Sequence, residues 1–344
     1  MESSYDISII LVNYKTPQLL LDCISSIVAE TGEVRYEIIV VDNNSADESE
    51  ELVRKNYPQV RWVNTGYNAG FARANNVGIR IAQGTYSLLL NSDTIVKEKA
   101  IVKSLHRYQL YEQTTNIGLL GCQIVHFDGY VQYNSNQGSA LWSKLRKSNP
   151  FYILIDRVLH GGRAATIKAD EEQQRLRSHQ TEHETGWLGG AFLLFNTAKI
   201  TGQDALLDED FFMYCEDQEW CLRLKAMGMH HYFYPGAYIL HAEGGSFTVK
   251  EGKYKQIILS EWLLILKLYG VPGYVAYLTI LIINQLTDGL LYLKSRKGTN
   301  APAALQQCHI RQWKWQMIRQ YGWRILRQYR SKPSAAAHYL KYGE

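Results

Sequence analysis

The first 115 residues alternate between short apolar runs and longer stretches of mixed polarity. The short runs are rich in β-branched residues and lack polar alternation, which is typical of strands buried on both faces of a parallel sheet. Strands that alternate with helices predict an α/β fold whose mostly parallel sheet is joined by right-handed crossovers. The predicted strands are 7–14, 37–45, 60–65 and 86–94, and the predicted helices are 17–31, 47–57, 70–83 and 95–112.

The regular alternation fades after residue 115. Two apolar runs on either side of Asp128-Gly129 predict a pair of strands joined by a turn. Residues 138–185 are polar, basic and acidic by turns, so they predict a variable excursion from the domain. The remaining predicted elements are a strand at 187–195, a helix at 216–227, and two short strands with a loop over 230–246.

The pattern changes again beyond Lys250, to long apolar helices and then a basic tail. No charged residue occurs from Leu268 to Thr287, a length that just suffices to span a bilayer. Pro272-Gly273 and Asn284-Gln285 interrupt this run near its two ends. The predicted domains are 1–250 and a helical extension over 251–344.

The basic tail has a composition of its own. Residues 310–332 mix Trp, Tyr and Ile with Arg and Lys, as helices that lie in a membrane interface do. This mixture favours in-plane binding to an anionic membrane over a single membrane span, and the span is kept as an alternative. The alternative is a core-packed helical pair that forms the interface of a homo-oligomer. Interleaved aromatic and basic residues also bind RNA, but nothing else in the chain supports a nucleic-acid partner.

Charge and cysteine usage narrow the class of protein. The net charge of +4 conceals an asymmetry, because residues from Lys294 onward carry 11 Lys or Arg and one acid, giving +10 there and −6 elsewhere. The five cysteines show no CxxC and no His/Cys pair at zinc spacing, which favours free thiols in a reducing compartment. The first residues lack the basic region of a signal peptide. We therefore expect a cytoplasmic active domain, held peripherally on the inner face of the cell membrane.

Polar residues end three of the predicted strands, at Asn13-Tyr14, Asp42–Asn44 and Asn91–Asp93. Ligands of open α/β sheets bind outside the carboxyl ends of the strands. The sequence therefore places a candidate site at this edge.

Two of these features suit a nucleotide. The Asp42 carboxylate can accept the imide N–H of uracil or thymine, although it can equally cap a helix. In the segment Asn68–Asn76, Gly70 permits close backbone approach, and Arg73 offers a donor beside a helix N-terminus that attracts phosphate. The alternative is a helix with a polar solvent face.

Asp93 and His241 together suit a divalent ion. An ion that bridges a diphosphate needs only one or two protein carboxylates, and imidazole is a ligand that Mn²⁺ accepts. Turn formation by Asp93 and a structural role for His241 are the competing interpretations.

The acid pair Glu216-Asp217 follows an aromatic run. A carboxylate beside apolar groups at a cleft can act as a general base. Acids in the first turn of a helix are equally typical of simple helix stabilisation.

Seven stretches in order resemble the family 2 glycosyltransferases of the GT-A fold, and more narrowly their bacterial rhamnosyltransferase-like branch. They lie between residues 9 and 246 and read "VNYKT", "VVDNNSAD", "NAGFARANNVGI", "LLLNSDT", "GWLGGAFLLF", "FFMYCEDQEWCLRL" and "ILHAEGGS". The QxxRW motif of processive members is absent, which implies transfer of one sugar or few.

This resemblance implies roles for individual residues. Asn91-Ser92-Asp93 stands where the family has its DxD motif, so Asp93 and His241 would hold Mn²⁺ or Mg²⁺. Asp217 is the implied base, with Glu216 beside it. The implied donor-binding residues are Asn13, Tyr14, Asp42, Asn44, Asn68, Gly70, Phe71, Arg73, Asn75, Asn76, Asn91, Ser92 and Asp93, and the implied acceptor-binding residues are Trp187, Gly189 and Gly190.

The resemblance implies an inverting enzyme that moves a sugar, rhamnose or similar, from a dTDP- or UDP-linked donor to a lipid-linked or saccharide acceptor. Residues 138–185 would then lie on the acceptor side. The alternatives are a nucleotidyltransferase of sugar phosphates, whose glycine-rich phosphate loop is missing from "ILVNYKTP", and a non-catalytic protein that binds nucleotide sugars.

Overall fold

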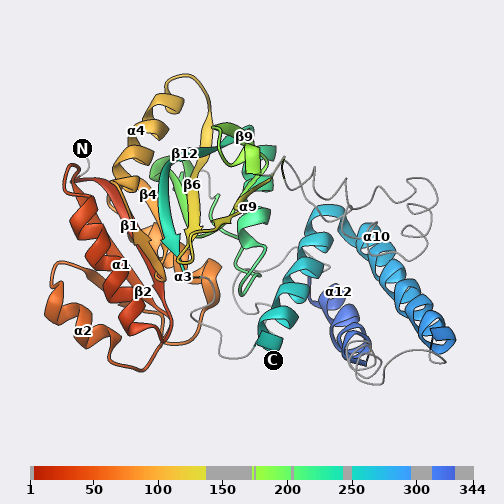
Figure 1. The fold of residues 1–344 in the computed structure, drawn as a ribbon. Helices are drawn as coiled ribbons and strands as arrows, with labels where there is room; N and C mark the ends of the chain where they lie inside the picture. Colours follow the sequence, from red (N-terminus) through yellow and green to blue (C-terminus); the bar gives the residue numbers. More distant parts are fainter. Residues whose placement is uncertain are drawn as a thin grey trace. The chain divides into compact units, whose positions relative to one another are not determined.

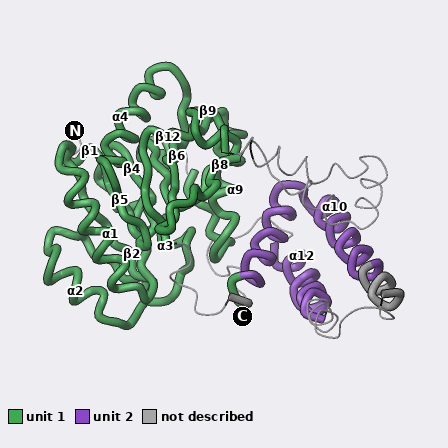
Figure 2. Tube along the Cα trace, viewed as in Figure 1, with its two compact units in different colours: residues 1–139, 173–253 green, residues 140–172, 254–344 purple. Residues whose placement is uncertain are grey.

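The computed structural model describes residues 4–136, 173, 176–202, 205–242, 250–295 and 312–329, with the backbone alone at 250–251 and 288–295. The chain forms two compact units, which are described separately here (Figure 2). Unit 1 comprises residues 1–139 and 173–253, and unit 2 comprises 140–172 and 254–344.

Unit 1 is built on a ten-stranded mixed sheet in the order β3-β2-β1-β4-β11-β6-β12-β5, with β7 paired to β6 and β9 paired to β12 (Figure 1). The two strands β8 and β10 form a separate small sheet. The strands are β1 Tyr5–Asn13, β2 Tyr36–Asp42, β3 Arg61–Asn64, β4 Gly84–Asn91, β5 Thr94–Val96, β6 Ile117–His126, β7 Val131–Gln132, β8 Ser135–Asn136, β9 His183–Thr185, β10 Trp187–Leu188, β11 Phe192–Asn196 and β12 His230–His241. The helices are α1 Pro17–Glu30, α2 Ser49–Asn56, α3 Gly70–Ile81, α4 Ala100–Glu112, α8 Thr197–Thr201 and α9 Glu216–Ala226.

Two apolar cores cover the two faces of this sheet. Alternate residues of β4 enter different cores: Leu88 and Leu90 pack with α1 and α4, whereas Leu89 packs with α3 and α9. Because both faces are buried, the central strands read as continuous apolar runs. The predicted α/β class and the first four predicted strands are confirmed, with β1 parallel to both β2 and β4.

Three details differ from the predicted elements. The helix predicted at 95–112 begins only at Ala100, since Thr94–Val96 forms β5 and pairs antiparallel with β12. The strand predicted at 187–195 is divided at Gly189-Gly190 into β10 and β11, which belong to different sheets. The two strands predicted over 230–246 are one long strand, β12, whose register against β6 shifts between Tyr234 and Tyr238.

The connection between β4 and β5 shapes the sheet. Only Ser92 and Asp93 join these strands, yet β11, β6 and β12 separate them in the strand order. The sheet must therefore curl until its far end approaches the carboxyl end of β4. This curl brings β12 beside the polar residues that end β4.

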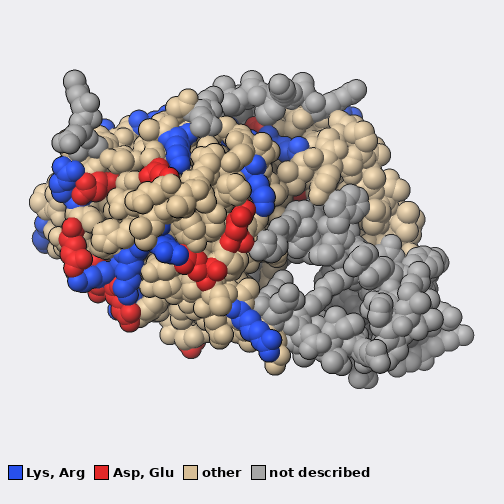
Figure 3. Space-filling model, turned by 90° about the horizontal axis from the view of Figure 1, so that it is seen from above, with Lys and Arg blue, Asp and Glu red and all other residues tan. Residues whose placement is uncertain are grey.

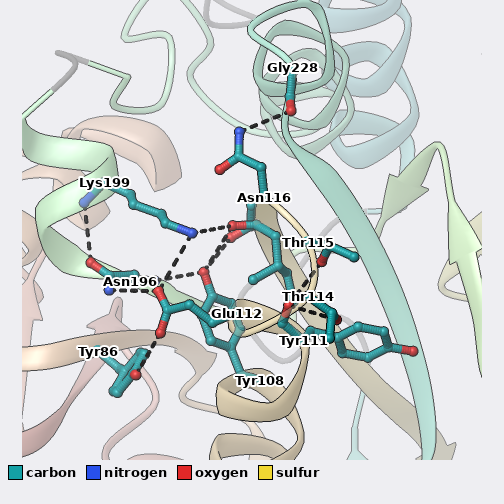
Figure 4. A network of polar contacts seen from close by, with 12 residues as sticks. Tyr86, Tyr108, Tyr111, Glu112, Thr114, Thr115, Asn116, Asn196, Lys199 and Gly228 are labelled. Carbon is teal, nitrogen blue, oxygen red and sulfur yellow. Dashed lines mark hydrogen bonds and ion pairs between the residues drawn. The ribbon is translucent and has the colours of Figure 1, made fainter.

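The opposite end of β4 carries a polar network around Glu112, the last residue of α4 (Figure 4). Its carboxylate accepts hydrogen bonds from the Tyr86 hydroxyl at 2.8 Å and the Asn196 amide at 2.9 Å, and the Lys199 ammonium lies 3.5 Å away. In the same network the Tyr108 hydroxyl donates to the carbonyl of Ile117. The network joins α4 to β4, β11 and α8.

The surface of unit 1 carries both signs of charge. On the face drawn in Figure 3, acidic and basic side chains are interspersed rather than gathered by sign. Several form ion pairs, among them Arg54 with Glu50 and Arg35 with Asp6.

Unit 2 contains α10 Lys250–Ser295, η1 Ile318–Gly322 and α12 Trp323–Tyr329. The backbone of α10 breaks at Gly270, whose φ is 63°, two residues before Pro272. The Tyr274 hydroxyl donates to the carbonyl of Gly322 at 2.9 Å, which ties the second arm of α10 to η1. By length and composition, the helix Gly252–Thr287 contains an 18-residue stretch that is apolar enough to cross a membrane, with a mean hydropathy of 1.6.

Candidate functional site

Asp93 and His241 lie together at the carboxyl end of the central strands. The His241 Nε2 atom is 3.3 Å from Asp93 Oδ1 and 3.2 Å from Asn91 Nδ2. The backbone fixes this pairing, because the N–H of Ala242 donates to the Asp93 carbonyl at 3.0 Å and His241 pairs with Thr94 in the ladder of β12 and β5. The structure thus unites the two residues that the sequence offered as metal ligands.

The Asp93–His241 pair fits a divalent ion. Neighbouring ligands of an octahedral ion with bonds of about 2.1 Å lie roughly 3 Å apart, close to the 3.3 Å between His241 Nε2 and Asp93 Oδ1. The described residues include no cluster of three or more His, Cys, Asp or Glu that could hold a metal. An ion here would need phosphate and water for its remaining positions, as ions on diphosphates do.

Asp42 ends β2 and is only 3% exposed. Its carboxylate accepts hydrogen bonds from Asn13 Nδ2 at 2.8 Å and Asn64 Nδ2 at 3.2 Å, and from the Ser45 backbone N–H at 2.9 Å and hydroxyl at 2.5 Å. These four bonds match the roughly four acceptor positions of a carboxylate. Asp42 therefore organises the turn after β2, and contact with a base would require one of these donors to move.

The start of α3 is held from two sides. Gly70 adopts a φ of +77°, and a Cβ at this position would lie 2.1 Å from the Phe212 carbonyl oxygen. The same carbonyl accepts the N–H of Phe71 at 2.7 Å, while Asn43 Nδ2 donates to the Gly70 carbonyl at 2.9 Å. Only glycine satisfies both the left-handed backbone and the close approach.

The polar side chains of α3 hold the segment that follows residue 205. Arg73 Nε donates to the Glu209 carbonyl at 3.0 Å, and Asn76 Nδ2 donates to the Leu207 carbonyl at 2.9 Å and to Glu209 Oε1 at 2.9 Å. Asn75 instead bonds back to the Phe71 carbonyl within the helix. In the structure these side chains fix the chain that leads to the acid pair, while the phosphate-binding role suggested by the sequence stays a prediction.

The acid pair Glu216-Asp217 forms the first turn of α9. Tyr214 and Cys215, just before it, both adopt left-handed backbone conformations, with φ of 71° and 66°. Two such residues in succession are costly without glycine, and they turn the chain sharply into the helix. Asp217 Oδ2 then accepts the N–H of Gly190 at 2.9 Å, and Oδ1 accepts the N–H of Gln218 at 2.7 Å.

Burial raises the pKa of both acids. Desolvation raises the pKa of Asp217, against the opposing effect of the N–H donors from Gln218 and Gly190. Desolvation, followed by the adjacent charge of Asp217, raises the pKa of Glu216 well above its ordinary value. Glu216 is 5% exposed, and its Oε2 atom has no hydrogen-bond partner within the part of the chain that the structure describes. The pair can therefore hold a proton at a pH where exposed carboxyls are ionised.

The predicted acceptor residues adjoin this pair. A Cβ at Gly190 would lie 3.5 Å from the Phe71 ring and 3.6 Å from the Asp217 Cβ. The N–H of Gly189 donates to the Asn134 carbonyl at 2.8 Å, and Trp187 pairs with Asn136 in the small sheet. Since the Ala191 carbonyl accepts the N–H of Asn91, this turn links the acid pair to the end of β4.

The remaining predicted donor residues lie around the same edge. Tyr14 is half-buried, with the Lys15 ammonium 5.4 Å from its ring centre. Asn44 is exposed with a φ of 57°, and Asn68 accepts the N–H of Gly70 at 3.2 Å. Ser92 is buried beside Asp93. No contact in the structure tests the binding roles of these residues, which stay predictions.

Sequence reasoning missed several residues that build the site. Asn43 holds Gly70, Phe212 caps α3, and Asn134 supports Gly189. Asn43 adjoins a predicted strand end, so its position could have suggested a role. The other two act through backbone carbonyls and carry no signal in their residue type.

Residues 8–167 match the model of the Glycosyl transferase family 2. This part of the chain belongs to that family. The resemblance drawn from the seven stretches is thereby confirmed at the level of the family.

Curated relatives of this chain come from bacteria and archaea. Glycosyltransferase GlyG of Streptococcus pneumoniae is 31% identical over 136 residues, which is 39% of this chain and 42% of the relative. Rhamnosyltransferase WbbL of Escherichia coli is 23% identical over 213 residues, which is 60% of this chain and 72% of the relative. The minor teichoic acid biosynthesis protein GgaB of Bacillus subtilis is 30% identical over 139 residues, which is 39% of this chain and 15% of the relative. The match thus spans less than half the length of GlyG and GgaB.

A solved structure shares the fold of this chain. The mannosyltransferase PcManGT of Pyrobaculum calidifontis, determined with GDP-Man and Mn²⁺, superposes with a TM-score of 0.53 at 13% identity, over 95% of this chain and 88% of that one. The likeness confirms the predicted GT-A-like fold.

Proposed function

We propose that the protein is an inverting glycosyltransferase that moves one sugar from a nucleoside-diphosphate donor to a hydroxyl of a glycan or lipid-linked acceptor. The carrying observation is that Asp93 with His241, and Asp217 with Gly190, lie along one edge of the sheet and are linked through the hydrogen bond between Asn91 and Ala191. The family match and the names of GlyG and WbbL support the same reaction class. The name of the minor teichoic acid biosynthesis protein GgaB supports a role in the assembly of cell-surface glycans.

In this mechanism Asp217 is the general base. Its carboxylate, oriented by the N–H of Gly190, would take the proton from the acceptor hydroxyl as that oxygen attacks the anomeric carbon. Glu216, whose pKa is raised further above its ordinary value, would stay protonated beside it and so leave Asp217 as the charged member.

Asp93 and His241 would hold Mn²⁺ or Mg²⁺ on the donor diphosphate. The bound ion supplies electrostatic stabilisation of the charge that develops on the leaving group. We assign the nucleobase of the donor to the turn that Asp42 organises. The donor would be a dTDP- or UDP-linked rhamnose or a similar sugar, and the name of the rhamnosyltransferase WbbL supports this choice. PcManGT, whose structure was determined with GDP-Man and Mn²⁺, supports a divalent ion.

The panel of donors is the decisive experiment. We would measure the thermal stability of the full chain with dTDP-, UDP- and GDP-sugars, each with and without Mn²⁺. Tight binding at 100 times Kd stabilises a protein by about 2.7 kcal/mol, so a matching donor is expected to raise Tm in the presence of Mn²⁺, and Asp93→Ala is expected to abolish the Mn²⁺-dependent part.

A positive donor is then tested for transfer. Release of nucleoside diphosphate with Mn²⁺ identifies a transferase, formation of nucleoside triphosphate on addition of pyrophosphate identifies a nucleotidyltransferase, and binding without turnover identifies a binding protein. If no nucleotide sugar raises Tm, the proposal is wrong.

We further propose that unit 2 binds an anionic membrane from the cytoplasmic side. A groove of about 480 Å³ on its last helical stretch is lined by Arg319, Arg324 and Arg327 beside Trp323, which is 57% exposed. Arginines with an exposed indole are typical of an interfacial site. A carbonate wash of membranes tests the mode of attachment, since a peripheral protein leaves the membrane and a spanning protein stays.

A further inference from the structure

Gln132 makes two contacts with His241. Its Oε1 atom lies 2.8 Å from the ring Nδ1 atom, and its Nε2 atom donates to the His241 backbone carbonyl at 3.3 Å. Gln132 belongs to β7, so it reaches His241 from outside the β5–β12 pair that holds the backbone of that residue.

The two contacts settle where the ring carries its proton. A carbonyl oxygen can only accept, so the Gln132 atom that faces the His241 carbonyl must be the NH₂ group. The amide oxygen is then the atom that faces Nδ1, and an oxygen can only accept, so Nδ1 must carry the proton. In the neutral ring this leaves Nε2 unprotonated, with its lone pair in the ring plane.

Nε2 is the ring atom that faces Asp93. The Asp93 carboxylate oxygen at 3.3 Å cannot donate, while the Asn91 amide at 3.2 Å can. An unprotonated nitrogen and a carboxylate oxygen directed at a common space are suited to a shared cation. Histidines that bind metals are usually oriented in this way, through a hydrogen bond from the nitrogen that does not bind.

We propose that Gln132 is a positioning residue that fixes the Nδ1–H tautomer and the ring orientation of His241, and so prepares Nε2 to bind a divalent ion beside Asp93. The inference rests on the metal role given to His241 in the proposed function. It adds a residue that none of the seven family-like stretches contains.

The hairpin that carries Gln132 is well suited to hold a side chain in place. Gln132 pairs with Ile124 of β6, and the turn is closed by the N–H of His126, which donates to the Tyr130 carbonyl at 2.8 Å. Gly129 takes the left-handed conformation that this turn requires, with a φ of +86°. Gln132 itself is half-buried, so its amide is partly shielded from competing water.

The first measurement is the tautomer of His241 in the unmodified chain. ¹⁵N NMR of histidine-labelled protein distinguishes protonated from unprotonated ring nitrogens, and the His241 signals are identified by their loss in His241→Ala. We expect protonated Nδ1 and unprotonated Nε2. A protonated Nε2 with a bare Nδ1 would overturn the inference, whatever the variants do.

The second measurement is binding of Mn²⁺ alone, followed by the EPR signal of the free ion. Removing an outer partner of a metal ligand typically lowers affinity 10–100-fold, and we expect a loss in this range for Gln132→Leu. Gln132→Glu keeps an acceptor for Nδ1–H, so it is expected to retain Mn²⁺ affinity within a few-fold. Gln123→Leu, a half-buried glutamine on the neighbouring strand, is the matched control and is expected to bind like the parent.

The variants separate this inference from the proposed function. If His241→Ala binds Mn²⁺ as well as the parent does, the metal role of His241 fails. If His241→Ala weakens binding but Gln132→Leu does not, the role of Gln132 fails and the proposed function stands. If Gln132 had a purely structural role, Gln132→Leu would lower Tm without changing the tautomer of His241, and Gln132→Glu would not rescue Mn²⁺ affinity.

Discussion

Two glutamates at opposite ends of the unit 1 sheet have opposite environments. Glu112 lies beside the amino end of β4 and is surrounded by donors, with the Tyr86 hydroxyl and the Asn196 amide both within 2.9 Å (Figure 4). Glu216 lies beside the carboxyl end, is 5% exposed, and has a side-chain oxygen with no partner. An unpaired buried polar group costs about 1–3 kcal/mol, so the protein bears at one end a cost that it avoids at the other.

The contrast separates polar groups that hold the fold from polar groups that are kept ready for a ligand. Around Glu112 a charge is matched by donors from three elements, and the result is a rigid joint. At the other end, the Asp217 carboxylate accepts the backbone N–H groups of Gly190 and Gln218, whereas Glu216 Oε2 has no hydrogen-bond partner among the described residues. Four predictions test this division, from the largest expected effect to the smallest.

Asp217→Asn should give the largest change. The amide oxygen can still accept the N–H of Gly190, so the fold and donor affinity should be preserved, while loss of the base lowers turnover by about 10²–10⁴-fold. The rate of nucleoside diphosphate release from the best donor measures this effect. Glu112→Gln is the matched control at the other end and should keep its turnover. Activity above a tenth of the parent in Asp217→Asn would remove Asp217 from the role of base.

Glu112→Ala should affect stability and leave turnover intact. Removal of the carboxylate leaves Tyr86, Asn196 and Lys199 without their shared acceptor, which should cost roughly 1–3 kcal/mol. Urea unfolding measures the loss, and turnover per folded molecule should equal that of the parent. Glu51→Ala, an exposed acid on α2, should be nearly neutral. Equal stability of both variants would contradict a structural role for the network.

Glu216→Gln should stabilise the protein at neutral pH and do little at acid pH. Burial raises the folded-state pKa of Glu216, so the folded state binds the proton more tightly than the unfolded chain does. The stability linked to that proton is complete below the unfolded pKa of about 4.3 and is lost as pH rises through the folded pKa. Glutamine is always neutral, so the free energy of unfolding of the variant should exceed that of the parent at pH 7 and differ little from it at pH 4.

Urea unfolding at pH 4 and pH 7 measures this advantage. A variant that is less stable than the parent at pH 7 would show that Glu216 has a partner when it is charged, and the division between the two ends would then disappear.

Tyr86→Phe should give the smallest change. The variant removes one hydrogen bond to Glu112 and leaves the bond from Asn196, so a cost of about 0.5–1.5 kcal/mol is expected. Burial, followed by the adjacent Glu112, raises the pKa of the Tyr86 hydroxyl to about 12, so an absorbance titration of the parent gives an independent check on the same contact. An ordinary phenol pKa near 10 in that titration would show that the contact is not formed in solution.

The sequence predicted the parts of this molecule that depend on local pattern. Apolar runs identified β1, β2 and β4, because strands buried on both faces contain little else, and the polar residues after them lie at the carboxyl edge of the sheet. Asp93 and His241 were also expected as a pair of metal ligands, from their residue types and from the family resemblance, but their contact in space depends on the pairing of β12 with β5. Nothing local to either residue encodes it.

The errors arose where distant contacts decide the structure. Residues 94–96 read as the start of a helix, but they form a strand because β12 is there to pair with them. Arg73 and Asn76 read as donors for a phosphate, which stays a prediction, but their bonds to residues 207–209, far along the chain, could not be read from the pattern. Residue type shows that a side chain can donate; only the fold shows what accepts.

The two-residue connection between β4 and β5 has a consequence for the order of folding. Asn91 and His241 are 150 residues apart in sequence, and contacts of such high separation form late because the entropy of closing long loops must first be overcome. The early strands can assemble from near neighbours, but Asp93 and His241, the proposed metal ligands, meet only when β12 docks. The candidate site would therefore be complete only when the domain is fully folded. A chain halted before β12 would lack His241 and could not complete the site.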